Sequence, residues 1–203
     1  MAGTVLLDVA DGVATLTLNR PQALNALSVE MMEDLAEAAR ALSGRADFAV
    51  VVVKGAGEHF MAGGDLKDFS RQLSLSPDAR LAVFKAMIVQ HINPTVELLQ
   101  SLPQPVIASV RGACAGFGLS LIAGCDLVVA ADNAKFTTAY SAIALSGDGG
   151  ASYFLPRIVG TRKAAELLLL AGRFDATEAQ RLGLLNRVVP DAELEATVAK
   201  LVT

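Results

Sequence analysis

The residues best placed to do chemistry lie in one glycine-rich stretch, Pro105 to Asp126. It opens with the short apolar run Val106-Ile107-Ala108, which predicts a buried strand, and the apolar residues from Leu119 onward predict a helix. Three glycines separate the two, at Gly112, Gly116 and Gly118. Glycine lets the backbone approach a ligand closely, and the first turn of a helix has free N–H groups. The stretch therefore predicts a site for an oxyanion or a phosphate.

A second glycine pair, Gly63-Gly64, follows the residues Phe60-Met61-Ala62. Its backbone N–H groups are further candidates to face a ligand. The two cysteines, Cys114 and Cys125, are too few and too poorly spaced for a metal site. We interpret them as buried free thiols and expect no metal.

The composition limits the class of protein. The chain has 203 residues, 53% of them hydrophobic, which is enough for one substantial core. The net charge of −4 gives no electrostatic reason to expect a nucleic-acid partner. The longest apolar run begins at Leu119 and is ended by Asp126, short of the roughly 18 residues of a membrane span. An N-terminus with Asp8, Asp11 and no basic region is unlike a secretory signal, so we expect a cytoplasmic protein.

The elements that must position these residues alternate between strands and helices. The runs 5–9 and 13–18, joined at Asp11-Gly12, predict a hairpin. Ser28 is expected to cap a helix. Its apolar stripe is Met32, Leu35, Ala39 and Leu42. Further strands are predicted at 48–53, 106–108, 126–131 and 135–140, and helices at 77–92, 94–101, 161–171, 176–182 and after Pro190. This alternation indicates an α/β fold.

Four motifs, in order along essentially the whole chain, resemble those of the crotonase (enoyl-CoA hydratase/isomerase) superfamily. They are Asn19-Arg20-Pro21 with Ala23-Leu24-Asn25-Ala26-Leu27, then Phe60 to Leu66, Pro105 to Asp126, and Ser146 to Gly160. The resemblance implies a crotonase-like spiral of repeated strand–strand–helix units over residues 1–190. Residues 191–203 are expected to be the start of a C-terminal helical segment that is otherwise largely missing. A homo-oligomer, either a trimer or a dimer of trimers, is also implied.

The resemblance further implies an acyl-CoA thioester as substrate, with CoA as part of that substrate and no other cofactor. In the family, two backbone N–H groups hold the thioester oxygen, and by position these donors are Gly64 and Phe117. Removing a proton beside the thioester carbonyl puts negative charge on the oxygen, which fixed donors stabilise. Besides these two, the residues expected to contact CoA or the acyl group are Ala23, Leu24, Ala62, Gly63, Asp65, Leu66 and Tyr140.

The reaction depends on the acids and bases around these donors. The family's hydratases use two glutamates, and here those positions hold Ser120 and Tyr140. A different carboxylate, Asp148, stands where the similar enoyl-CoA isomerases have an aspartate that moves a proton. We therefore expect an enoyl-CoA isomerase in which Asp148 takes a proton at C2 and returns one at C4.

Three alternatives stay open. A 4-halobenzoyl-CoA dehalogenase would use Asp148 as a nucleophile, but His91 does not align with the histidine of that reaction without a gap. An enoyl-CoA hydratase would need carboxylates that Ser120 and Tyr140 do not supply. A non-catalytic acyl-CoA-binding or assembly protein would keep the N–H donors and lack the chemistry.

Several candidates also have ordinary structural interpretations. Asp148 precedes a helix, where capping is the usual role of Asp, and Asp65 is expected to cap the helix that follows it. His59 is interpreted as a surface residue. The side chain of Phe117, where the family often has glycine, must point away from the thioester or shape the pocket. Candidates for contacts with CoA phosphates, or for ordinary solvated cations, are Arg20, Lys54 and Lys67.

Overall fold

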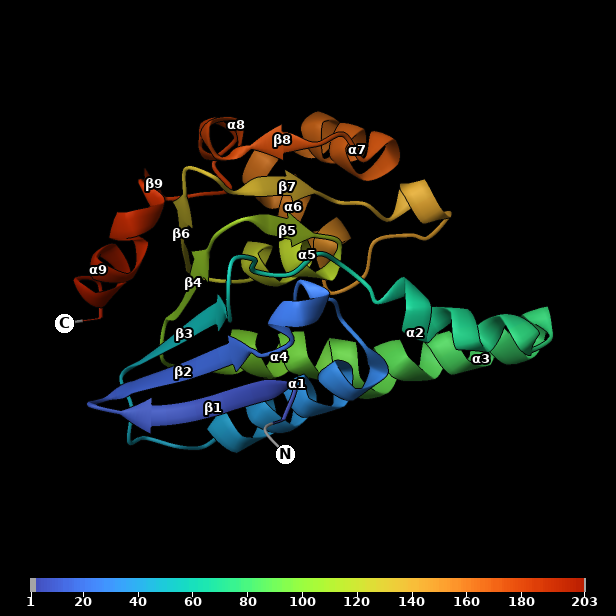
Figure 1. The fold of residues 1–203 in the computed structure, drawn as a ribbon, viewed down its shortest axis with the longest axis horizontal. Coiled ribbons are helices and arrows are strands. Elements are labelled where there is room, and N and C mark those ends of the chain that lie inside the picture. Colours follow the sequence, from blue (N-terminus) through green and yellow to red (C-terminus); the bar gives the residue numbers. More distant parts are fainter. Residues whose placement is uncertain (1–2, 203) are drawn as a thin grey trace.

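The main sheet of the computed structural model, which describes residues 3–202, has six strands and lies to the left in Figure 1. The strands lie in the order β1-β2-β3-β4-β6-β9. The pair β1–β2 is antiparallel and the other neighbouring pairs are parallel. The strands are Val5–Ala10 (β1), Val13–Leu18 (β2), Val50–Gly55 (β3), Val106–Val110 (β4), Leu127–Ala131 (β6) and Arg187–Val189 (β9). The predicted α/β fold is confirmed.

The hairpin between β1 and β2 is the one that the sequence predicts. Asp11 and Gly12 have positive φ angles of 52° and 77°, as a tight two-residue hairpin turn requires. Along β2 the side chains of Ala14, Leu16 and Leu18 are fully buried, and the alternate ones are half-buried. This period of two turns one face of the hairpin toward the core.

Helix α1, Val29–Leu42, packs on β1 and β2 and against α4, Asn93–Ser101. Ser28 caps α1 and accepts a hydrogen bond from the N–H of Met31 at 3.2 Å. The whole predicted apolar stripe is buried, namely Met32, Leu35, Ala39 and Leu42. Cap and stripe together confirm the prediction for this helix.

The opposite face of the sheet is covered by α9, Leu194–Ala199. Leu194 and Val198 pack with Val52 of β3 and Val129 of β6 in a cluster separate from the main core. The sequence neighbours of Val52 and Val129 belong to the main core, so the central strands are covered on both faces. The segment predicted to start a C-terminal helical region thus packs on the main sheet, while Thr203 lies outside the described residues.

A second, smaller sheet lies beside β4, β6 and β9 of the main one, to their right in Figure 1. Its strands are β5, Ala113–Ala115, β7, Lys135–Thr137, and β8, Phe174–Asp175. The sequence did not predict β5, because it lies in the glycine stretch where a turn was expected. Cys114 of β5 also forms a parallel bridge with Met61, so this strand joins the two glycine loops.

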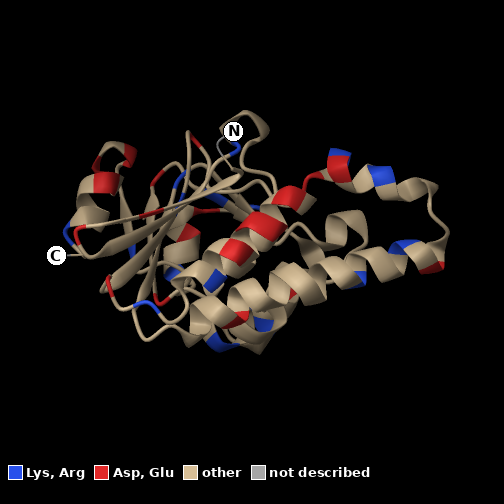
Figure 2. Ribbon diagram, turned by 90° about the horizontal axis from the view of Figure 1, so that it is seen from below, with Lys and Arg blue, Asp and Glu red and all other residues tan. Residues whose placement is uncertain are grey.

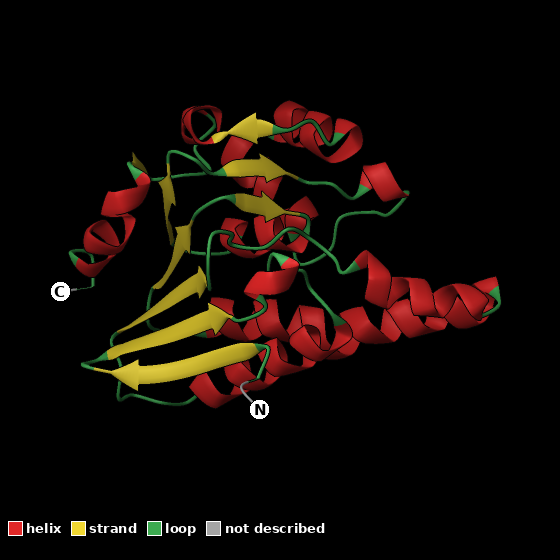
Figure 3. Ribbon diagram, in the orientation of Figure 1, coloured by secondary structure: helices red, strands yellow, loops and turns green. Residues whose placement is uncertain are grey.

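A long helical arm projects beyond the sheet, to the right in Figures 1 and 3. Its outer helices are α2, Leu66–Ser70, and α3, Pro77–Met87. Helix α3 continues through a π-helical turn, Ile88–Ile92, into α4, so the prediction of two separate helices at 77–92 and 94–101 is wrong. Pro94 has no N–H to offer the carbonyl of Gln90, and Arg40 Nη2 lies 3.5 Å from that oxygen instead.

The remaining helices follow the predicted pattern. They are α5, Phe117–Ala123, α6, Ala151–Val159, α7, Thr161–Leu170, and α8, Ala176–Arg181. Acidic and basic residues are mixed over the helices (Figure 2). Among residues 3–202, no helix is long and apolar enough to cross a membrane. The same residues contain no group of three or more His, Cys, Asp or Glu side chains placed to hold a metal ion.

Candidate active site

The two glycine loops lie side by side because the segments before them pair like strands. The N–H groups of Phe60 and Met61 donate to the carbonyls of Arg111 and Ala113, both at 2.9 Å. The N–H of Ala115 donates back to the Met61 carbonyl at 2.8 Å. This ladder brings two segments that are far apart in the sequence to the same edge of the molecule.

Gly116 approaches the other loop very closely. A Cβ atom at Gly116 would lie 3.3 Å from the Gly63 Cα and 4.0 Å from the Gly64 nitrogen. Gly63 and Gly116 also have positive φ angles of 96° and 52°. Glycine is therefore favoured at both positions by backbone conformation, and at Gly116 by the close approach as well.

The backbone N–H groups of Gly64 and Phe117 have no acceptor in the part of the chain that the structure describes. Phe117 is buried and begins α5. Buried N–H groups are nearly always hydrogen-bonded, so the unpaired donor of buried Phe117, beside that of half-buried Gly64 at one cavity, indicates a place for a ligand oxygen. Two such donors from separate loops are what an oxyanion hole requires.

A mostly apolar cavity of about 210 Å³ lies beside these donors. It is lined by Leu27, Met32, Ala62, Gly63, Gly64, Leu66, Phe69, Gly116, Phe117, Ala139, Tyr140, Ala142, Ile143, Leu145 and Asp148. The structure thus brings both predicted N–H donors, the predicted base and Tyr140 to one place. An apolar lining suits an acyl group and strengthens electrostatic interactions inside the cavity.

Asp148 is held in this cavity by a chain of buried hydroxyl groups. Tyr140 Oη donates to Asp148 Oδ1 at 2.6 Å, and Ser120 Oγ lies 2.8 Å from Tyr140 Oη. An ionised carboxylate only accepts hydrogen bonds, so the phenol donates to Asp148 and the serine hydroxyl donates to the phenol oxygen. Tyr140 and Ser120 stand at the positions of the hydratase glutamates. Tyr140 therefore contacts Asp148 directly, and Ser120 is linked to it through Tyr140.

Burial determines the protonation states of Asp148 and Tyr140. It raises the pKa of Asp148 above its ordinary value, although the hydrogen bond from Tyr140 opposes the rise. Burial also raises the pKa of Tyr140, and the neighbouring charge of Asp148 adds to that effect. The phenol therefore keeps its proton, and the carboxylate is a stronger base than an exposed aspartate.

The loop that carries Asp148 packs against Phe117. A Cβ atom at Gly149 would lie 2.7 Å from the Phe117 ring, and Gly149 has a positive φ of 55°. This glycine makes room for the ring, which fills space beside the cavity. Asp148 does not cap α6, because the N-cap is Gly150 and no side chain caps the helix. The capping interpretation is wrong, and the carboxylate is directed to Tyr140 instead.

A larger groove of about 770 Å³ adjoins the cavity. Both are lined by Ala62, Gly64 and Leu66. The groove is also lined by the other residues predicted to contact CoA, namely Ala23, Leu24 and Asp65. Among the basic candidates, Lys67 lines the groove as well. A larger groove of mixed lining beside a small apolar cavity offers room for a ligand that has both a polar and an apolar part.

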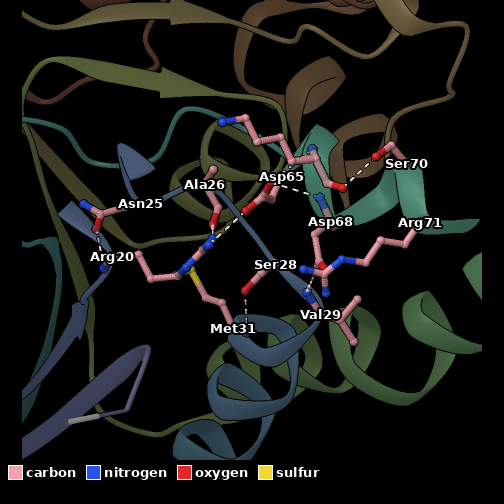
Figure 4. A network of polar contacts seen from close by, with 11 residues as sticks. Arg20, Asn25, Ala26, Ser28, Val29, Met31, Asp65, Asp68, Ser70 and Arg71 are labelled. Carbon is pink, nitrogen blue, oxygen red and sulfur yellow. Dashed lines mark hydrogen bonds and ion pairs between the residues drawn. The ribbon is translucent and has the colours of Figure 1, made fainter. Parts of the chain in front are cut away.

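Arg20 ties the walls of this groove together (Figure 4). Its Nη1 donates to the Ala26 carbonyl at 2.5 Å, and its Nη2 pairs with Asp65 Oδ2 at 2.9 Å. Asp65 caps α2, as predicted, by accepting from the N–H groups of Lys67 and Asp68 at 3.2 Å. Burial pushes the pKa of Asp65 upward, but the hydrogen bonds from Arg20 and the backbone outweigh it and hold the pKa below its ordinary value. Arg20 is therefore not a solvated cation.

Three other candidates lie away from the cavity. His59 is half-buried rather than on the surface, and its Nδ1 accepts from the N–H of Ala113 at 3.0 Å. His91 lies in the π-helical turn and is not among the cavity's lining residues. Lys54 pairs with Glu195 at 3.6 Å rather than lining the groove.

Sequence reasoning missed two contacts in this site. The chain from Ser120 through Tyr140 to Asp148 joins side chains from three segments, and no local pattern reports their distance. The Arg20–Asp65 pair had a usable signal, since each residue lies in a motif assigned to the same CoA site. Both cysteines are free, as predicted, but only Cys114 is buried and Cys125 is half-buried. Burial raises the pKa of the Cys114 thiol.

Comparison with known proteins identifies the family to which this chain is similar. The family model for enoyl-CoA hydratase/isomerase matches residues 8–203. The 1,2-epoxyphenylacetyl-CoA isomerase of Escherichia coli (strain K12) is 37% identical over 97% of this chain and 74% of its own length. The 4-chlorobenzoyl coenzyme A dehalogenase-2 of an Arthrobacter species is 30% identical over 97% of this chain and 70% of its own. The crystal structure of an enoyl-CoA hydratase from Mycobacterium smegmatis has a TM-score of 0.88 at 35% identity, covering 99% of this chain and 76% of that one.

These matches agree in sequence and in fold over nearly the whole chain. The names of the relatives cover three activities, isomerase, dehalogenase and hydratase, so the family is common to them and the reaction is not. The chain belongs to the enoyl-CoA hydratase/isomerase family and has the crotonase fold.

Proposed function

We propose that the protein is an enoyl-CoA isomerase, which moves a double bond along an acyl-CoA through a thioester enolate. One observation carries this proposal: Asp148 is the one carboxylate among the cavity's described lining residues, and it lies beside the unpaired N–H groups of Gly64 and Phe117. A double-bond shift needs one base that returns the same proton. Adding water in the family's manner needs two carboxylates.

The proposed reaction starts from a 3-enoyl-CoA whose thioester oxygen accepts hydrogen bonds from Gly64 and Phe117. Asp148 takes a proton from C2, and the electrons of that C–H bond form a dienolate with its negative charge on the thioester oxygen. Asp148 then returns a proton to C4 while the double bond forms between C2 and C3 and the carbonyl is restored. Protons and electrons balance without an oxidant, a reductant or added water.

The N–H donors and the base share the work in this scheme. Losing one donor of an oxyanion hole typically costs roughly 3 kcal/mol of barrier, so the pair is expected to supply much of the rate. Asp148 supplies the proton transfer, and burial raises its pKa toward the range in which a base works well near neutral pH. The adjoining groove leaves room for CoA outside the apolar cavity.

A turnover screen tests the proposal with 3-enoyl-, 2-enoyl- and 4-halobenzoyl-CoA. We expect conversion of 3-enoyl- to 2-enoyl-CoA by the parent protein, and a loss of about 10³-fold in Asp148→Asn, the usual scale for a removed general base. Asp47→Asn is the matched control, because Asp47 is exposed and pairs with Arg45. Undiminished isomerisation by Asp148→Asn would reject Asp148 as the base.

Dehalogenation is the second candidate function, because the Arthrobacter relatives are named for it and Asp148 is available as a nucleophile. Against it, His91 does not line the cavity. If the protein is a dehalogenase, heavy oxygen from labelled water should enter the Asp148 carboxylate during turnover.

Binding of a CoA thioester with no turnover of any substrate would instead favour a non-catalytic acyl-CoA-binding protein.

Two expectations about the whole protein stay predictions from the sequence. They are the assembly into a homo-oligomer, either a trimer or a dimer of trimers, and the cytoplasmic location. Neither is needed for the chemistry above, because the described chain by itself supplies the two N–H donors and the carboxylate.

A further inference from the structure

We propose that Tyr140, supported by Ser120, is the positioning residue of Asp148. It fixes the carboxylate through Oδ1 and leaves Oδ2 to exchange the proton with the acyl chain. The inference rests on the proposed isomerase function, because it assigns roles around the base of that reaction. It concerns two residues that occupy the positions of the hydratase glutamates and have no assigned part in isomerisation.

The hydrogen bonds that link Ser120, Tyr140 and Asp148 are short and shielded from water. Tyr140 Oη lies 2.6 Å from Asp148 Oδ1, and Ser120 Oγ lies 2.8 Å from Tyr140 Oη. Tyr140 is 7% exposed and Ser120 1% exposed. Within residues 3–202, Tyr140 is the one side chain that donates a hydrogen bond to the Asp148 carboxylate, which also receives one from the backbone N–H of Asp148 itself. Since Asp148 lines the cavity, Oδ2 is the oxygen left for the substrate.

The backbone around Tyr140 is held in an unusual conformation. Ala139 and Ala144 have positive φ angles of 60° and 57°, which residues other than glycine rarely adopt. The carbonyl of Tyr140 accepts from the N–H groups of Ile143 and Leu145 at 3.1 and 3.0 Å. Such conformations persist only where the surrounding structure enforces them, and they gather at functional sites. Here they fix the segment that aims the phenol at Asp148.

Tyr140 is the one titratable side chain that faces Asp148 among the residues of known placement. The elements packed around the Asp148 loop contribute uncharged residues: Ser120 and Phe117 from α5, Ala151 from α6 and Leu168 from α7. The other residues that line the cavity are uncharged as well. A change in the ionisation of Asp148 after removal of the phenol hydroxyl can therefore be assigned to this one hydrogen bond.

The hydrogen bond from Tyr140 affects the ionisation of Asp148. A hydrogen bond to a charged carboxylate is stronger than one to the neutral acid, so the phenol favours the ionised form. Burial raises the pKa of Asp148, and Tyr140 limits that rise. Replacing Tyr140 by Phe keeps the ring and removes the donor. The pKa of Asp148 should then rise further.

A carbon-13 NMR titration of the aspartate carboxyl groups tests this without any substrate. The Asp148 signal is identified by its absence in Asp148→Asn. We expect its midpoint to move up by about one pH unit in Tyr140→Phe, the scale of a hydrogen bond to a charged group. Ser120→Ala should give a smaller shift in the same direction, because hydrogen bonds in a chain reinforce one another. Tyr153→Phe changes the other tyrosine, which is 56% exposed on α6, and should give no shift.

The pH dependence of kcat/KM with 3-enoyl-CoA as substrate provides a second test. The acid limb of kcat/KM should move up by the same amount in Tyr140→Phe, so that on its acid side the rate falls about tenfold and recovers at higher pH. An unchanged midpoint in Tyr140→Phe, or a loss of rate that is equal at every pH, would overturn the inference. If no isomerisation depends on Asp148, the proposed function fails, and the NMR titration still decides whether Tyr140 controls the carboxylate.

Discussion

Asp65 and Asp148 border the same site, yet their pKa values move in opposite directions. Both carboxyl groups are partly buried, which raises the pKa of each. Asp65 has the guanidinium of Arg20 and two backbone N–H groups, and these lower its pKa overall. Asp148 has hydrogen bonds from the phenol of Tyr140 and from its own backbone N–H, and these do not outweigh burial, so its pKa stays raised. The first aspartate is suited to holding the groove in place, and the second to accepting a proton.

The raised pKa of Asp148 predicts a cost in stability. A carboxyl group whose pKa is higher in the folded state favours folding below its unfolded pKa, and this contribution is lost as the pH rises through the folded pKa. We therefore expect Asp148→Asn to have a free energy of unfolding about 1 kcal/mol larger than that of the parent at about pH 8, and so to unfold at a higher temperature, as replacements of functional residues often do. The gain should shrink as the pH falls and vanish below about pH 3, where the carboxyl group is protonated in both states.

Thermal unfolding across this pH range checks the prediction, with Asp47→Asn as control. Asp47 is exposed, and the hydrogen bond from Arg45 lowers its pKa, so its replacement should give no gain at the higher pH. A stabilisation by Asp148→Asn that grows toward acid pH would contradict the sign derived for Asp148.

At the scale of elements, the sequence predicted the helix caps, apolar stripes and turns that depend on interactions between residues close together in the chain. The Ser28 cap, the buried stripe of α1 and the Asp11-Gly12 turn depend on residues within a few positions of one another. Strands β5 and β8 have three and two residues and exist through pairings with distant segments, so no periodicity indicates them. The π-helical turn also escaped prediction, because the apolar pattern runs through it without a break.

The close packing of the Asp148 loop on α5 gives a prediction for Gly149. A Cβ atom there would lie 2.7 Å from the Phe117 ring and 3.1 Å from the Ser120 Cβ, at a positive φ. We expect Gly149→Ala to destabilise the protein by roughly 3 kcal/mol, which combines backbone strain with overpacking. Activity should fall with it, since Phe117 and Asp148 must move apart.

Gly44→Ala is the matched control for this change. Gly44 also has a positive φ, 78°, but a Cβ there meets no atom within 4 Å. It should cost only the backbone strain, about 1 kcal/mol, and leave turnover intact. Denaturant unfolding and turnover of both variants give the comparison. Equal losses in the two variants would show that the contact with Phe117 does not matter.

At the scale of the whole molecule, the site is assembled from segments spread along most of the chain. The cavity takes residues from the region of Leu27, from Ala62 to Phe69, from Gly116-Phe117 and from the segment between Ala139 and Asp148. The resemblance placed most of these correctly, because each lies in a motif with a fixed order along the chain. It did not reveal the hydrogen bond between Tyr140 and Asp148, since motif order carries no distances between side chains.

The most direct test of the central claim follows one hydrogen atom through the cavity. A 3-enoyl-CoA that carries deuterium at C2 is given to the parent protein and to Asp148→Asn, and the position of the label in the product is determined by mass spectrometry and NMR. If one buried carboxylate moves the proton, part of the 2-enoyl-CoA formed by the parent carries deuterium at C4, and Asp148→Asn forms essentially none of this product. Labelled product formed by Asp148→Asn at the rate of the parent would contradict the account.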